Sequence, residues 1–157
     1  MLAIDPSLRS TGWAFFVDGE LRRWGTVEPE KGLTGEKAVA SLVVAFHSLA
    51  RELGPVDMLA VESQFVSVNM KVGLLLARVR GLLEGTVLGL YGPGIVLTGI
   101  TPSDARKRLG IGQAARSEIK AMVADYVRRT YPGKDFGKKD DVTDAVAVGL
   151  AVIALTD

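Results

Sequence analysis

Four acidic residues stand where their side chains could act together. Asp5 and Glu62 each close a short apolar run, and Asp141 and Asp144 begin an otherwise apolar segment. A spacing of three residues puts Asp141 and Asp144 on one face of a helix. Carboxylate oxygens are the ligands that Mg²⁺ prefers. Four converging carboxylates would suit two such ions about 4 Å apart, an arrangement that catalyses phosphodiester hydrolysis.

Each acid also has an ordinary structural explanation. An aspartate before a proline, as at Asp5, is common in turns, and Glu62 could mark the point where a buried strand meets solvent. Asp140, Asp141 and Asp144 could cap the start of a helix and interact with its dipole. The coincidence of two strand-end acids with an acidic first helical turn favours a shared site over separate explanations.

The composition excludes several other kinds of site. The 157 residues include no cysteine and one histidine, His47. Disulfides, thiolate nucleophiles, cysteine zinc clusters and multi-histidine metal sites are therefore excluded. No G-x-S-x-G pattern provides a nucleophilic serine. An enzyme of this composition would depend on carboxylates, hydroxyls, lysine and arginine, and we expect His47 to be structural.

Basic charge is concentrated in one part of a nearly neutral chain, whose total charge is +1. Residues 100–139 hold ten basic and four acidic side chains, a net charge of +6, which leaves −5 for the rest. A local excess of this kind fits contact with a polyanion such as nucleic acid. Two solvated helix faces would produce the same count, so the charge alone leaves both interpretations open.

Hydrophobic periodicity and turn residues predict the elements that must position the acids. Strands are expected over residues 1–5, 11–17, 20–27, 58–61 (running into Glu62) and 95–100. Helices are expected over residues 34–53, 69–90, 102–109, 114–131 and 141–155. Asp18-Gly19 is a hairpin signal between the second and third strands. This order predicts one α/β domain over residues 1–157, with a five-stranded mixed sheet flanked by helices. Its first three strands form an antiparallel meander.

Nothing in the sequence suggests a membrane protein. The N-terminus lacks the basic and apolar regions of a signal peptide. The uncharged stretch over residues 85–103 contains five glycines and two prolines, which makes it a poor membrane span. A soluble, cytoplasmic protein is expected.

At its acidic motifs the sequence resembles the RuvC family of Holliday junction resolvases. Residues 3–7, 61–65 and 141–147 are similar to the family's first-strand, second-carboxylate and last-helix motifs. Gly110-Ile111-Gly112, followed by Arg116-Ser117, is similar to its basic loop. The matches follow the family's order and span nearly the whole chain. Ala105 departs from the pattern, because relatives often carry lysine there, and Arg106 is the neighbouring candidate for that role.

The resemblance implies a ribonuclease H-like nuclease that resolves four-way DNA junctions by symmetric nicks, in recombination and DNA repair. Asp5, Glu62, Asp141 and Asp144 would be its catalytic residues and its ligands for two Mg²⁺ ions, for which Mn²⁺ could substitute. Phe65 and Arg116 match family positions near DNA, although Phe65 could instead be an ordinary core residue. The basic region adds three expected DNA contacts: Arg106, Lys107 and Lys120. The implied partners are junction DNA, a second copy of the chain and branch-migration proteins, in a prokaryotic or viral setting. The broadly apolar helix over residues 69–90 is a candidate dimer surface, and burial of the whole helix in the core of its own domain would explain the same pattern equally well.

Other functions fit some of the same residues. The four acids would equally serve a looser nuclease for branched or flap DNA, or one for RNA–DNA hybrids. A non-catalytic junction-binding protein is a further alternative, which the four intact acids disfavour. An actin-like phosphotransferase shares the first-strand aspartate, but the chain is too short for two lobes and contains no P-loop.

Overall fold

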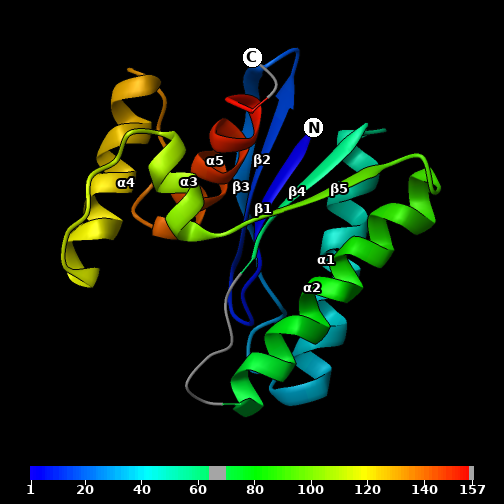
Figure 1. Cartoon of the computed structure of the whole chain (residues 1–157). Helices are drawn as coiled ribbons and strands as arrows, with labels where there is room; N and C mark the ends of the chain where they lie inside the picture. The colour runs from blue at the N-terminus through cyan, green and yellow to red at the C-terminus, as the bar shows by residue number, and fades with distance from the viewer. Residues whose placement is uncertain (64–69, 156–157) are drawn as a thin grey trace.

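A five-stranded mixed sheet forms the centre of the molecule, in the order β3-β2-β1-β4-β5 (Figure 1). The computed structural model describes residues 1–63 and 70–155, without the side chains of Arg116 and Ser117. The strands are β1 (Leu2–Asp5), β2 (Thr11–Val17), β3 (Glu20–Val27), β4 (Met58–Glu62) and β5 (Val96–Ile100). The first three pair antiparallel, and β1–β4 and β4–β5 pair parallel. The predicted sheet, including its meander, is therefore confirmed.

Helices cover both faces of this sheet (Figure 1). One face carries α1 (Gly35–Leu53) and α2 (Met70–Tyr91), and the other carries α3 (Pro102–Arg108), α4 (Arg116–Thr130) and α5 (Asp140–Ile153). The predicted helix ends lie within two residues of these, which is the usual scatter at fraying termini. Within the described ranges, no helix is long and apolar enough to cross a membrane.

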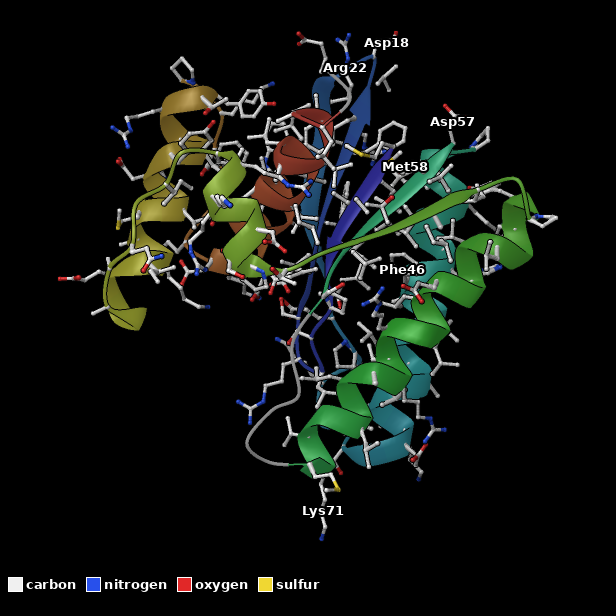
Figure 2. All side chains as sticks on the ribbon, in the orientation of Figure 1. Asp18, Arg22, Phe46, Asp57, Met58 and Lys71 are labelled. Atoms are coloured by element: carbon white, nitrogen blue, oxygen red, sulfur yellow. The ribbon has the colours of Figure 1, made fainter. Side chains whose placement is uncertain are left out.

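Alternating side chains of the strands divide the core into two layers. Leu2 and Ile4 of β1 belong to the layer under α1 and α2, where Phe46 is completely buried (Figure 2). Ala3, between them, belongs to the layer under α5, together with Ala14 and Ala60. These small side chains leave room for α5 to lie close to the centre of the sheet.

The same alternation aims the two strand-end acids at α5. Asp5 has the parity of Ala3, and Glu62 has the parity of Ala60. The β1–β4 register pairs Leu2 with Leu59 and Ile4 with Val61, so Asp5 and Glu62 follow at the same level. Figure 2 shows Asp57 and Met58 where β4 begins, so the acids lie at the opposite end of the sheet.

Gly12 allows the first turn of α5 to meet the sheet beside Asp5. In β2 it pairs with Asp5, and a Cβ atom added to it would lie 1.8 Å from the backbone oxygen of Asp141. Any side chain at this position would therefore push the helix start away from β1. The absence of a side chain at Gly12 brings the acidic turn of α5 against the two strand ends.

Replacing Gly12 with alanine should test this contact. The added methyl must displace backbone, so we expect Gly12→Ala to lower the free energy of unfolding by about 1–3 kcal/mol, as overpacking does. Urea denaturation would measure the loss. Gly94→Ala is the matched control, because a Cβ there would meet no atom within 4 Å. Equal stabilities of the two variants would contradict the close approach of α5.

Candidate active site

Three elements bring the predicted acids to one place. Asp5 ends β1 and is 8% exposed, Glu62 ends β4 and is half-buried, and Asp141 and Asp144 lie in the first turns of α5. These residues are distant in sequence, and the parallel β1–β4 pairing and the seating of α5 on Gly12 join them. The ends of β1 and β4 and the first turns of α5 thus lie together, as the sequence predicts.

The electrostatics of the group reflect this crowding. Burial raises the pKa of Asp5 well above its usual range, and the negative charges of Glu62, Asp144 and Asp141 raise it further. Burial also raises the pKa of Glu62 to about 7, to which the charge of Asp144 adds. A glutamate with a pKa near neutrality beside a second buried acid with a raised pKa is typical of functional sites.

Asp144 shows the same behaviour, although a cation lies beside it. Burial, together with the charges of Asp140 and Asp141, raises its pKa to about 6, while Lys120 acts in the opposite direction. The Nζ atom of Lys120 lies 3.9 Å from Oδ2 of Asp144 and 3.9 Å from Oδ2 of Asp140. The lysine, expected from the sequence as a DNA contact, is therefore also a counter-ion of the acidic group.

Asp140 also belongs to the acidic group, although its position in the sequence predicts only a helix cap. Its carboxylate shares Lys120 with Asp144, four residues later on the same helix face. The i,i+4 spacing of the two acids can be read from the sequence. That they share one lysine becomes evident only from the structure, where α4 places Lys120 beside both.

A pocket of about 280 Å³ opens beside the acids, between β4 and helices α3, α4 and α5. Most of its wall is apolar, and its polar groups are two acids and two cations: Glu62, Asp144, Arg106 and Lys120. Cations next to carboxylates can hold an anion, such as a phosphate, over the acids.

The other expected DNA contacts have different positions. Arg106 lines the pocket, whereas Lys107 is exposed on α3 and is not among the lining residues. Ala105, which stands where relatives often have lysine, is buried in the pocket wall. Arg116 begins α4, but its side chain lies outside the described residues, as does the whole of Phe65.

The suitability of the site for a metal ion can be tested on its atoms. Among the residues that the structure describes, no three acidic or histidine side chains are arranged as a ready ligand group. One carboxylate atom nevertheless lacks a partner: within the same residues, Oδ1 of Asp5 is buried without a hydrogen bond. A buried carboxylate oxygen of this kind is costly unless something pairs with it. The oxygen-only set around it has the chemistry that Mg²⁺ or Mn²⁺ requires.

Comparison with known proteins links this architecture to one family. The family described as "Crossover junction endodeoxyribonuclease RuvC" matches residues 1–152. The RuvC proteins of Paracoccus denitrificans and Chlorobaculum parvum are 31% and 27% identical, over 96% and 94% of this chain and 88% and 78% of theirs. The structure of T. thermophilus RuvC in complex with Holliday junction substrate has a TM-score of 0.78 at 18% identity, covering 99% of this chain and 95% of that one. The predicted ribonuclease H-like fold is thus confirmed.

The raised pKa values predict how stability depends on pH in the absence of divalent metal. A carboxyl with a raised pKa in the folded state binds more protons folded than unfolded, so its ionisation opposes folding. Stability should therefore fall as pH rises through about 6 for Asp144 and about 7 for Glu62. We expect a loss on the order of 2 kcal/mol between about pH 5 and about pH 8. Urea denaturation in EDTA would measure it.

A matched pair of variants would assign this pH dependence. Glu62→Gln removes the ionisation and should flatten the profile, making the variant more stable than the wild type at the alkaline end. Glu30→Gln removes an exposed carboxylate that is not among the charges acting on Asp5, Glu62 or Asp144, and it should retain the wild-type profile. A wild-type protein equally stable across the range would contradict the raised pKa values.

Proposed function

The chain belongs to the RuvC family of crossover junction endodeoxyribonucleases, and we propose that it resolves four-way (Holliday) DNA junctions by paired, symmetric nicks. One observation carries the proposal beyond family membership: acids from three separate elements meet at one end of the sheet, beside a pocket that contains Arg106 and Lys120. This arrangement suits hydrolysis of a phosphodiester whose charge the cations can bind.

The acids are proposed to hold the divalent metal ions of the reaction. Asp5, Glu62, Asp141 and Asp144 would be the ligands, with Mg²⁺ as the expected ion and Mn²⁺ as a substitute. When bound, the ions supply an activated water as the nucleophile and stabilise the leaving 3′ oxygen. The buried Oδ1 of Asp5 supports this assignment, because a cation would provide the partner that it lacks among the described residues.

The basic residues would bind and orient the DNA backbone. Arg106 suits the contact because its planar fork can hold two phosphate oxygens. Lys120 already lies at the acids, where it can move between carboxylates and an incoming phosphate. Lys107 and Arg116 are proposed to hold flanking phosphates. Phe65 is proposed to stack on a base at the opened junction centre.

A second copy of the chain is proposed to bind along α2. One side of this helix is buried through Val79, Leu83 and Val87, while Leu74, on the opposite side, is 67% exposed. That exposed side also carries Gly81, Gly85 and Gly89, and a Cβ atom on any of these would meet nothing within 4 Å. Each helical glycine costs stability. A partner that needs the space above them would explain why they are there.

A homodimer would also explain how paired cuts arise. A two-fold dimer presents two identical sites related by the symmetry of a four-way junction, so each subunit can nick one strand. We further propose that residues 1–157 act as one nuclease domain, in the cytoplasm of a prokaryotic cell and on cellular or viral DNA. Branch-migration proteins are proposed as its further partners.

Cleavage of a synthetic four-way junction would test the proposed activity. With Mg²⁺, the wild type should release symmetric nicked duplexes, and Glu62→Gln should cut at least about a hundredfold more slowly because a metal ligand is lost. Junction binding in EDTA should survive in the variant, and Glu30→Gln should cut like the wild type. Binding without any metal-dependent cleavage would indicate a non-catalytic binder. Faster cutting of flaps or RNA–DNA hybrids would replace junctions as the substrate.

Sedimentation equilibrium would test the dimer surface with two substitutions of equal exposure. Leu74 on α2 and Val44 on α1 are both 67% exposed. Leu74→Glu should weaken dimerisation by at least about tenfold, because a charge would be buried at the contact. Val44→Glu should dimerise like the wild type. A monomeric wild type would exclude the dimer, and equal effects of the two substitutions would exclude this face.

A further inference from the structure

An arginine of α2 reaches the residue that directly follows Glu62. The Nη1 atom of Arg80 donates to Oγ of Ser63 at 2.8 Å, and its Nε donates to Oε1 of Glu84 at 2.7 Å. The Arg80 side chain is 35% exposed and that of Glu84 is 19% exposed. Glu84, one helical turn after Arg80, fixes the direction of the guanidinium, which leaves a second donor aimed at Ser63. The arginine end of this hydrogen bond is therefore held in a fixed direction by another side chain.

The position of Ser63 is determined by its backbone as well. Glu62 pairs with Ile100 across β4 and β5, and the backbone N–H of Ser63 donates to the oxygen of Ile100 at 2.8 Å. Strand pairing therefore continues one residue beyond the glutamate. Backbone pairing on both sides of Glu62, at Val61 and at Ser63, therefore keeps the chain extended there.

Gly99 of β5 provides the space that this contact occupies. A Cβ atom on Gly99 would lie 2.4 Å from Oγ of Ser63 and 3.2 Å from Nη2 of Arg80. A side chain at this position would displace the serine hydroxyl and press on the guanidinium. Three elements, α2, β4 and β5, thus contribute to one small assembly behind the end of β4.

The assembly lies on the face of the sheet opposite the acids. Successive side chains of a strand alternate, so Ser63 points toward α2 while Glu62 points toward α5. The Arg80–Ser63 hydrogen bond therefore restrains the end of β4 from the face opposite the acids.

We propose that Arg80 is a positioning residue for Glu62, acting through Ser63 and held in place by Glu84. The proposal rests on the assignment of Glu62 to the nuclease site. Among the residues that the structure describes, Arg80 hydrogen-bonds to Ser63 and Glu84 rather than to the acidic group itself. It sets the direction in which Glu62 leaves the strand, and displacements of about 1 Å at a reacting centre can cost a hundredfold in rate.

Single-turnover cleavage of a four-way junction would test the proposal, with junction affinity in EDTA measured alongside. Ser63→Ala removes one oxygen atom, and Arg80→Met removes the donor. Both should cut at least about tenfold more slowly and need more Mg²⁺ for half-maximal rate. Their affinity and thermal midpoint should remain near the wild-type values. The double variant should be no slower than the slower single variant, because both changes break the same hydrogen bond.

Two further variants separate positioning from general packing. Arg80→Lys keeps a donor but loses the fork that Glu84 orients, so its rate should be intermediate between wild type and Arg80→Met. Arg23→Met is the matched control: it removes an arginine that pairs with Glu52 of α1, away from the acids, and should leave the rate unchanged.

The outcomes distinguish this proposal from the function on which it rests. If Glu62→Gln is inactive while Ser63→Ala and Arg80→Met cut at the wild-type rate, the positioning role is wrong and the nuclease assignment stands. If the slow variants lose rate only in proportion to the unfolded fraction, the contact is structural and the proposal fails. If the wild type cuts no junction, both fall together. Should Arg80→Met not fold, Ser63→Ala alone decides.

Discussion

The burial of several carboxylates at one end of the sheet is the constraint around which this molecule is arranged. Burial first, and the negative charge of neighbouring acids second, raises the pKa values of Asp5, Glu62 and Asp144, which reflects the cost of holding them there. Packing on both faces of the sheet holds these acids in place. On one face, the start of α5 lies directly against Gly12, and on the other, Arg80 of α2 hydrogen-bonds to Ser63 at the end of β4. Lys120 offsets part of the charge from the side of α4.

Much of this arrangement could be predicted from the sequence because it depends on local patterns. Apolar runs that stop at Asp5 and Glu62 mark strand ends, and alternation along each strand determines the face that each acid occupies. The apolar segment after Asp144 marks a buried helix, with its acids in the first turns. These signals need only neighbouring residues, so the sheet and the approximate site followed from them.

The remaining features depend on contacts between distant segments, and local patterns do not show them. The sequence around Gly12 does not distinguish it from other strand glycines, and only the structure shows that the backbone of Asp141 lies against it. Ser63 and Arg80 have no sequence relation that predicts a hydrogen bond, because helix phase and strand register together determine their meeting. Lys120 was recognisable as a basic residue, but its place between Asp140 and Asp144 required the packing of α4 on α5.

The parallel pairing of β1 with β4 has a consequence for how the protein acquires its activity. Side chains alternate with a period of two, so a register slip of one residue would turn Glu62 to the opposite face while most of the sheet survived. Pairings between distant segments form slowly during folding. α5, which completes the acidic group, follows both strands in the chain. If the acids act as proposed, partly folded and misregistered chains would be catalytically silent, so only the correctly registered fold would cut DNA.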